Sequence, residues 1–575
     1  MNLTYLDNYE KWLSSDSLSA EEKAELNAIS GDDREIRERF SFGLTFGTGG
    51  LRGIMKTGMN AMNVHTVAQA TQGLANHILK CKKDNGGVVV GRDSRINSEL
   101  FAKTAARVLA ANGIKVYIFR DIQPTPELSF ALRRLGCTAG VNITASHNPK
   151  EYNGYKAYWE DGAQLSLDDA DAVKAEIDAT DVFADVKYTD FDEAVEKGLI
   201  TYLGEDMDEA YLAAVRAEAV NPDVISADAD NLKIVYSPLH GTGYKLVPEL
   251  LRSLGLKNLY VVPEQSKPDG NFPTVKKPNP EYRETLSLGI GLANKVGSDL
   301  MFANDPDADR MGAVARAKDG SFVTITGNQM GALLLDYILT AYEETGKMPK
   351  EPYAVKTIVS TELVTRICRA HGIRLYNVLT GFKFIAEVIK KREAEGHGTF
   401  VFGFEESYGY MKGTYARDKD GVVAAMLVCE MTAYYKLKGM TLIDALEALW
   451  AKTGYSLEST DELYIEGLDG AEKIKAIMEK LREDPPKTLG GVKVEAVGDY
   501  LKGEFTDTAT GKKSPTGLPE SNVMYFRTET GDVVIARPSG TEPKIKFYYL
   551  VSSSDKEHAP VLLEAYKASI ATYKN

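Results

Sequence analysis

The sequence predicts three similarly wound α/β domains with mixed, mainly parallel sheets, followed by a C-terminal α+β domain. Two observations support this class. Short runs rich in valine and isoleucine alternate with amphipathic helical stretches, as in parallel sheets covered by helices. In addition, a unit consisting of a helix, a terminating glycine and a strand recurs at domain-sized spacing. Its copies lie at residues 108–117, 250–260 and 367–376.

The glycines of these copies are Gly113, Gly255 and Gly372. Each suits the position just after a helix end, where the left-handed backbone conformation is favoured. Beyond about residue 455 the pattern changes to one helix, residues 471–482, and several strands. The chain of 575 residues is long enough for several cores. The expected domains span residues 1–203, 204–318, 319–452 and 453–575.

Composition narrows the class of protein. Hydrophobic residues make up 43% and charged residues 26%, as in ordinary soluble globular proteins. The net charge of −14 argues against nucleic-acid or membrane partners, and an anionic substrate would need a locally basic cleft. The four cysteines are far apart without a C-x-x-C pair, which favours a reduced, cytoplasmic protein. No secretory signal and no apolar run of membrane-spanning length is found, so we expect no export.

A serine lies at the predicted carboxyl edge of the first sheet. Residues 139–144 resemble a short buried strand that leads into Thr144-Ala-Ser146-His147-Asn-Pro149. Open α/β folds bind ligands at this edge. No G-x-S-x-G surrounds Ser146, so a nucleophile elbow for acyl transfer is not indicated. Alone, a serine before proline favours a helix N-cap, but three further loops argue against that interpretation.

The second loop, Asp305-Pro-Asp307-Ala-Asp309-Arg310, follows the predicted strand 300–303. Its carboxylates at alternate positions can converge on one hard cation. A calcium EF-hand is excluded because its sixth and twelfth positions, which need glycine and glutamate, are arginines here. Three negative charges suit Mg²⁺ that also accepts a phosphate oxygen. A solvated acidic turn is an equally good interpretation of this string alone.

The third loop, residues 403–409, follows the predicted strand 400–402. Its Glu405 and Ser407 stand two residues apart, so they could accept hydrogen bonds from and donate them to vicinal sugar hydroxyls. The start of a capped helix is the alternative.

The fourth loop, residues 536–543, combines the guanidinium of Arg537 with the hydroxyls of Ser539 and Thr541 and the unhindered backbone of Gly540. Such a set can form a compact nest for a phosphate dianion. A plain turn is the alternative.

A glycine-rich segment, residues 46–53, misses G-x-G-x-x-G because Arg52 occupies the place of the last glycine. No G-x-x-x-x-G-K-[ST] occurs, so dinucleotide-binding and kinase interpretations lose their main support. Basic residues around the loops would supply the positive field that a phosphorylated substrate requires. They are Arg52, Arg92, Arg95, Lys156, Arg310, Lys383, Arg417 and Arg537.

The motifs T-A-S-H-N-P, D-P-D-A-D-R, G-F-E-E-S-Y-G and R-P-S-G-T-E-P, in this order, resemble those of the α-D-phosphohexomutase superfamily. Flanking matches, among them F-G-T-G-G-L-R-G, N-G-Y-K and Y-S-P-L-H-G-T-G, extend the resemblance to nearly the whole chain. The E-E-S-Y-G and L-T-G-F-K segments are most similar to the phosphoglucomutase branch, which includes phosphopentomutases. The resemblance implies four domains around a central cleft, the last of them similar to the TATA-binding-protein fold. Phe404 departs from the shorter G-E-E-S form of the third loop.

The resemblance implies that Ser146 carries a phosphoryl group and that Mg²⁺ is held by a phosphoserine oxygen and by Asp305, Asp307 and Asp309. It implies interconversion of glucose 1-phosphate and glucose 6-phosphate, with glucose 1,6-bisphosphate as primer and intermediate. Glu405 and Ser407 would bind sugar hydroxyls. The residues expected to hold the second phosphate are Arg537, Ser539, Gly540 and Thr541.

Within this mechanism, Arg310 and Arg52 would stabilise the charge of the transferring phosphoryl group. Lys156 and Lys383 are candidate proton acceptors, because crowding among cations would lower a lysine pKa. His147 is expected mainly to orient the phosphoserine. Phosphopentomutase and phosphomannomutase activity, a metal-dependent sugar-phosphate phosphatase and a non-catalytic sugar-phosphate-binding protein are the alternatives. The oligomeric state is left open by the sequence.

Overall fold

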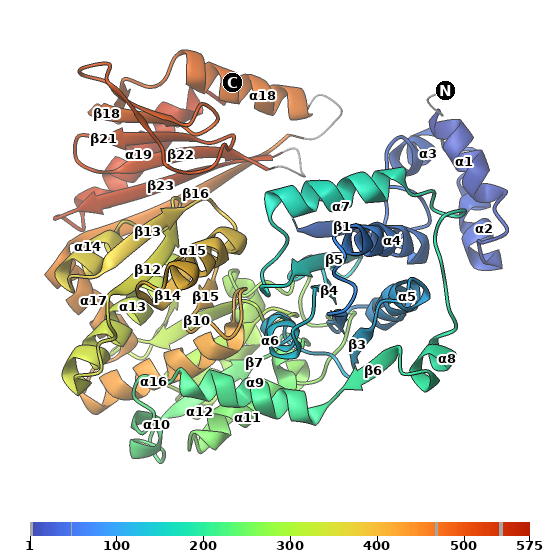
Figure 1. Ribbon diagram of the computed structural model, residues 1–575. Helices are drawn as coiled ribbons and strands as arrows, with labels where there is room; N and C mark the ends of the chain where they lie inside the picture. Colours follow the sequence, from blue (N-terminus) through green and yellow to red (C-terminus); the bar gives the residue numbers. More distant parts are fainter. Residues whose placement is uncertain (1–3, 48, 466–469, 540–543, 575) are drawn as a thin grey trace. The chain divides into compact units, whose positions relative to one another are not determined.

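Figure 1 shows a computed structural model that describes residues 4–47, 49–465, 470–539 and 544–574. The chain forms two compact units. Unit 1 comprises Met1–Ala315 and Gly409–Tyr434, and unit 2 comprises Arg316–Tyr408 and Tyr435–Asn575.

The first sheet of unit 1 has six strands in the order β1-β5-β4-β2-β3-β6 (Figure 1). The neighbours from β4 to β6 run parallel, whereas β1, β5 and β4 pair antiparallel. The strands are β1 (Gly50–Ile54), β2 (Val88–Arg92), β3 (Val116–Phe119), β4 (Ala139–Ile143), β5 (Tyr152–Trp159) and β6 (Ile200–Leu203). The accompanying helices are α4 (Val64–Lys80), α5 (Ser98–Ala111), α6 (Thr125–Leu135), α7 (Leu167–Ala179) and α8 (Phe191–Glu196).

Three N-terminal helices precede this sheet: α1 (Tyr5–Leu13), α2 (Ala20–Ala28) and α3 (Asp33–Phe40). They share a small apolar cluster in which the rings of Trp12 and Phe40 meet edge to face. The sheet has a core of its own, with β-branched side chains such as Val90, Val116 and Val141 fully buried.

A second sheet of unit 1 contains β10, β9, β7 and β8 in that order. Strand β7 pairs in parallel with both β8 and β9, and β10 pairs antiparallel with β9. The strands are β7 (Lys233–Ser237), β8 (Asn258–Val261), β9 (Leu300–Asn304) and β10 (Met311–Arg316). The other elements are β15 (Gly409–Met411), α9 (Glu205–Ala217), α10 (Val224–Ala227), α11 (Gly243–Ser253), α12 (Ser287–Val296), α16 (Gly421–Leu437), and the 3₁₀ turns η1 (Pro263–Gln265) and η2 (Arg283–Leu286).

Unit 2 contains the parallel strands β13, β12 and β14. These strands are β12 (Pro352–Thr357), β13 (Arg374–Val378) and β14 (Thr399–Glu405), accompanied by β11 (Phe322–Ile325), α13 (Gly327–Thr345), α14 (Leu363–Ala370), α15 (Phe382–Glu395) and α17 (Leu442–Thr453).

The C-terminal part of unit 2 is an antiparallel sheet in the order β16-β23-β22-β21-β18-β19-β20, with β17 beside β18. Apolar residues of its two helices share a core with the sheet. The elements are β16 (Tyr455–Tyr464), α18 (Gly470–Glu483), β17 (Thr488–Leu489), β18 (Val492–Asp499), β19 (Glu504–Asp507), β20 (Lys513–Pro515), β21 (Met524–Thr528), β22 (Val533–Pro538), β23 (Lys544–Ser553) and α19 (His558–Ala571).

The predicted fold class is confirmed, since three α/β sheets with parallel pairs precede an antiparallel α+β region. Gly113, Gly255 and Gly372 have φ values of 77°, 91° and 67°, so each adopts the predicted left-handed conformation. The predicted helix 471–482 corresponds to α18.

The prediction that a loop begins after residue 402 is wrong. Strand β14 continues to Glu405 because Gly403 and Phe404 pair with Val355 and Lys356 of β12. Turn residues 406–408 follow the strand, so the alternative of a capped helix there is also wrong.

The four cysteines are all free. Within the described ranges, no helix combines the length and the apolar character needed to cross a lipid bilayer.

Candidate functional site

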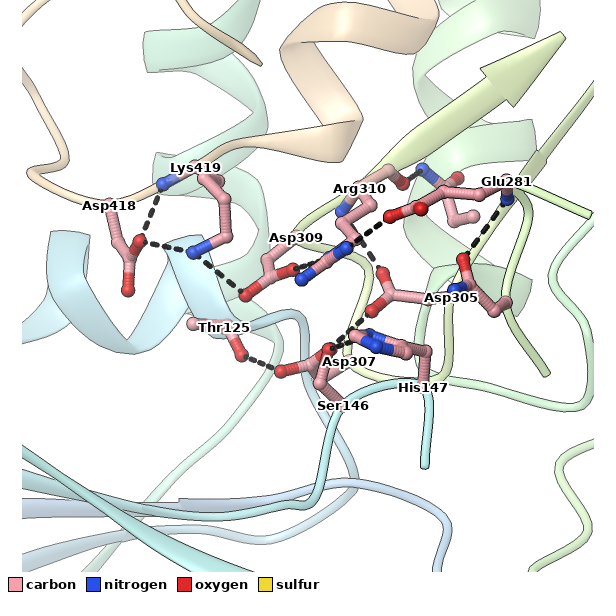
Figure 2. Close-up of polar contacts among 12 residues, drawn as sticks. Thr125, Ser146, His147, Glu281, Asp305, Asp307, Asp309, Arg310, Asp418 and Lys419 are labelled. Atoms are coloured by element: carbon pink, nitrogen blue, oxygen red, sulfur yellow. Dashed lines mark hydrogen bonds and ion pairs between the residues drawn. The ribbon is translucent and has the colours of Figure 1, made fainter. Parts of the chain in front are cut away.

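Ser146 lies in the turn that follows β4, in unit 1, and its side chain is buried. Its hydroxyl donates a hydrogen bond to Oδ2 of Asp305 over 2.7 Å (Figure 2). The backbone of Ser146 has φ +50°, the left-handed region that residues with a Cβ rarely adopt. Its N–H donates to Oγ1 of Thr144 over 2.8 Å. The serine is therefore held in one unusual orientation, with its hydroxyl facing the aspartate loop.

Arg95 holds this serine loop in place. Its guanidinium is buried, pairs with Asp93 over 3.3 Å and donates to four backbone carbonyl oxygens at 2.5–2.9 Å. These carbonyls belong to Ser146, Asn148, Pro149 and Tyr152. The donors of Arg95 thus serve the protein's own backbone, while its positive charge is one of those that lower the pKa of His147 beside the serine.

Asp305, Asp307 and Asp309 form the predicted carboxylate cluster after β9. Their side chains are buried, and one oxygen from each lies within 4.8 Å of the other two. Burial, followed by repulsion from Asp307 and Asp309, raises the pKa of Asp305 well above its ordinary value. In the described part of the chain, Oδ1 of Asp307 and Oδ1 of Asp309 are buried without a hydrogen-bond partner. Convergent oxygens with unused acceptor capacity fit a hard cation such as Mg²⁺.

Cationic and hydroxyl groups also contact these carboxylates. Lys156 Nζ donates to Oδ2 of Asp307 over 2.7 Å and to Oδ2 of Asp309 over 3.0 Å. Lys419 Nζ lies 3.3 Å from the same oxygen of Asp309. The Thr125 hydroxyl at the start of α6 donates to Asp307 over 2.8 Å (Figure 2).

The expectation that cations lower the pKa of Lys156 is wrong. Burial does lower this pKa, but the carboxylates of Asp307 and Asp309 outweigh burial, so the pKa lies above its ordinary value. Sequence reasoning also missed Lys419. The sequence does hold a signal for Lys419, because basic and acidic residues alternate over residues 417–420, directly before the apolar helix α16.

Arg310, His147 and Arg52 lie near the serine loop, and the guanidinium of Arg52 donates to Oδ1 of Asn148 over 3.0 Å. The backbone N–H of Arg310 donates to Oδ1 of Asp305 over 3.0 Å. Nδ1 of His147 lies 3.2 Å from the Ser146 hydroxyl. Burial, and then the charges of Arg310 and Arg52, hold the pKa of His147 well below its usual range. Unit 1 thus brings these three residues together with Lys156, the serine and the aspartates.

Unit 2 carries the other predicted residues. Glu405, the last residue of β14, accepts a hydrogen bond from the backbone N–H of Gly381 over 2.7 Å. This bond joins the third loop to the L-T-G-F-K segment. Lys383 is buried in the first turn of α15, with its ammonium 5.3 Å from the ring centre of Phe384. Ser407 lies in the turn after β14.

Arg537 is the penultimate residue of strand β22 and donates to the hydroxyl of Tyr548 over 3.4 Å. Burial, followed by repulsion from Glu405, raises the pKa of Glu406 to about 7, and the Arg537 guanidinium opposes this rise. The third loop, which holds Glu406, and the fourth loop, which holds Arg537, therefore lie close enough for their charges to interact. Glu406 was missed by sequence reasoning, although the E-E pair was its signal.

Ser539 directly follows the last residue of β22, and its backbone N–H donates to the carbonyl of Lys544 over 2.8 Å. The other two residues predicted for the phosphate nest, Gly540 and Thr541, lie outside the described residues.

Three stretches of the chain match sequence families described as phosphoglucomutase/phosphomannomutase alpha/beta/alpha domains. Domain I matches residues 43–182, domain II residues 209–320 and domain III residues 326–453.

Curated relatives match most of the chain. A phosphoglucomutase of Staphylococcus aureus (strain MRSA252) is 38% identical over 527 residues, which cover 91% of this chain and 92% of that protein. A phosphoglucomutase of Staphylococcus saprophyticus is 35% identical over 549 residues, which cover 96% of each chain.

Solved structures share the fold. The Paramecium protein pp63/parafusin, a phosphoglucomutase in its open form, has a TM-score of 0.68 at 18% identity, covering 92% of this chain and 95% of its own. A phosphoglucomutase/phosphomannomutase family protein from Burkholderia thailandensis has a TM-score of 0.65 at 19% identity, covering 92% of this chain and 97% of its own.

Proposed function

This chain belongs to the phosphoglucomutase/phosphomannomutase family, and we propose that it is a phosphoglucomutase, an intramolecular phosphotransferase that interconverts glucose 1-phosphate and glucose 6-phosphate. The observation that carries the proposal is the hydrogen bond of 2.7 Å from the Ser146 hydroxyl to Asp305, within a cluster of three buried aspartates. Relatives that are 35–38% identical along at least nine-tenths of the chain carry the name phosphoglucomutase, which supports glucose as the sugar.

In the active enzyme, Ser146 would carry the phosphoryl group. Transfer breaks the bond between phosphorus and the serine oxygen as a sugar hydroxyl oxygen bonds to phosphorus, giving glucose 1,6-bisphosphate. The bisphosphate then turns over, and its other phosphoryl group returns to the serine. The left-handed backbone of Ser146 and its anchoring by Arg95 support this role, because they fix the oxygen from which the group departs.

Positive charge must meet the oxygens of the transferring group. Arg310 and Arg52 are the proposed cationic side chains near Ser146, since both depress the pKa of the neighbouring His147. Asp305, Asp307 and Asp309 would hold Mg²⁺ together with a phosphoserine oxygen. When bound, the ion would supply further positive charge at the phosphoryl oxygens.

The attacking hydroxyl must give up its proton during transfer. Lys156, Lys383 and His147 are the proposed acceptors. His147 lies 3.2 Å from the serine hydroxyl, and Lys156 lies between two carboxylates of the cluster. Separate substitution of each residue, with the pH profile of kcat as readout, would identify the acceptor.

Residues of unit 2 would hold the rest of the sugar phosphate. Glu405 and Ser407 are proposed to bind sugar hydroxyls, whereas Arg537 and Ser539, with Gly540 and Thr541, would bind the phosphate that is not reacting. The electrostatic interaction between Glu406 and Arg537 supports this pairing, because it indicates that the turn after β14 and the end of β22 lie near each other.

A coupled assay across glucose, mannose, ribose and deoxyribose 1-phosphates, with and without glucose 1,6-bisphosphate, tests the proposal. We expect the highest kcat/KM with glucose 1-phosphate, stimulation by the bisphosphate and almost no release of inorganic phosphate. Preference for a pentose or mannose phosphate would reassign the substrate. Stoichiometric release of inorganic phosphate would instead identify a phosphatase.

A further inference from the structure

Glu281 faces Arg310 beside the aspartate cluster of unit 1. Its Oε1 accepts a charge-assisted hydrogen bond from NH1 of Arg310 over 2.5 Å. Only 16% of the Arg310 side chain and 27% of the Glu281 side chain are exposed to solvent. Figure 2 shows the carboxylate and the guanidinium pointing toward each other, with the carboxylate of Asp305 close by. This ion pair is shielded, unlike exposed surface pairs, which contribute little.

The backbone around Glu281 is fixed independently of this contact. The buried Asn279 accepts a hydrogen bond from the backbone N–H of Glu281 over 3.0 Å. The preceding Pro280 packs against Gly312 of β10 so closely that a Cβ on this glycine would lie 2.3 Å from the Pro280 carbonyl oxygen. Because β10 starts directly after Arg310, this close approach sets the separation of Glu281 and Arg310.

Arg310 is thus anchored at both ends. Its backbone N–H is bonded to Asp305, and its guanidinium is bonded to Glu281. An arginine side chain held at one end only would sample many rotamers, and ordering it costs conformational entropy. A charge that is already ordered before transfer needs no reorganisation during the reaction.

We propose that Glu281 is a positioning residue for phosphoryl transfer, which holds the Arg310 guanidinium in the orientation that meets the phosphoryl group on Ser146. The inference rests on the proposed function of the chain. In this role Glu281 acts through Arg310 rather than on the reacting atoms.

A double-mutant cycle in the full-length, Mg²⁺-loaded enzyme tests this role. We expect Glu281→Ala to lower kcat by about 10-fold to 100-fold, the loss typical of a misplaced reacting group, with KM changed by less than about threefold. Glu281→Gln should restore most of kcat, because an amide oxygen can still accept from NH1. In the Arg310→Ala background, Glu281→Ala should change kcat by less than about twofold.

The control is Asp230→Ala, which removes an exposed ion pair with Lys257 in the same unit and should leave kcat unchanged. Thermal unfolding of each variant separates a positioning role from a loss of fold, since Glu281→Gln and Glu281→Ala should differ in kcat more than in Tm. Normal kcat in Glu281→Ala would overturn the inference. So would a double variant in which the two single losses of kcat multiply, because the two residues would then act independently. An inactive wild-type chain would refute the proposed function instead.

Discussion

The hydroxyl of Ser146 donates to Asp305 over 2.7 Å although 159 positions separate the two residues in the chain. Ser146 follows β4 of the first sheet, and Asp305 follows β9 of the second. Each strand ends at the carboxyl edge of its sheet, where α/β folds bind ligands. The two edges meet within unit 1, so a phosphoryl group on the serine would lie beside three carboxylates.

Replacing Ser146 by alanine should abolish turnover while sugar-phosphate binding largely survives, because only the transferring oxygen is lost. Incubation with glucose 1,6-bisphosphate labelled with ³²P at one phosphate should label the wild-type chain and not the variant. Calorimetric titration with glucose 1-phosphate should give similar Kd values for both. A variant with near-normal activity would exclude Ser146 as the phosphoryl carrier.

Removal of metal should reversibly stop the enzyme. Treatment with EDTA is expected to abolish activity, and added Mg²⁺ should restore it. Asp307→Asn removes one negative charge and one of the two carboxylate partners of Lys156, so the Mg²⁺ concentration for half-maximal activity should rise by about tenfold or more. Asp206→Asn, an exposed change of the same kind on α9, is the matched control. Full activity of the wild type in EDTA would rule out a required metal.

Stability should fall as the pH rises, in part because of Glu458 on β16. Burial raises the pKa of this carboxyl to about 7, despite the hydroxyl of Thr361 that donates to it. The native state therefore binds more protons than the unfolded chain between pH 4.5 and 7. The contribution of Glu458 to the free energy of unfolding is fully present below this window and is lost as the pH passes 7. It amounts to about 3 kcal/mol at most.

Thermal unfolding at pH 5 and pH 8 checks this sign. Glu458→Gln should lose less stability than the wild type between the two pH values. Glu462→Gln, an exposed change on the same strand, should follow the wild type. Equal pH dependence of wild type and Glu458→Gln would show that another group is responsible.

Gly241 allows its loop to approach the aspartate loop. A Cβ at this position would lie 2.4 Å from Cα of Pro306, and the next residue donates its N–H to the Pro306 carbonyl over 2.8 Å. Backbone atoms cannot rotate away, so Gly241→Ala should cost about 2 kcal/mol and weaken Mg²⁺ binding by displacing Asp305 and Asp307. Chemical denaturation and Mg²⁺ titration measure the two effects.

Gly291→Ala on α12 provides the contrast, because the added Cβ has nothing within 4 Å apart from the adjoining backbone of its own helix. In a helix interior this change should stabilise the protein by about 0.5–1 kcal/mol. Destabilisation of similar size at both positions would show that the close approach at Gly241 is not the cause.

The sequence by itself determined the wound α/β class, the glycine helix ends and the serine and aspartate loops, because these features follow from local periodicity and backbone preference. It misplaced the end of β14, since Gly403 and Phe404 are held in the strand by pairing with β12, a contact that local sequence does not encode.

Only the tertiary structure decided what the charged side chains do. Arg95 and Lys156 both belonged to one predicted basic field, yet Arg95 holds the serine loop and Lys156 pairs with Asp307 and Asp309. Glu281 and Lys419 reach the aspartate loop from distant positions in the chain. Electrostatic energy depends on distance through space and on burial, and neither quantity is set until the chain has folded.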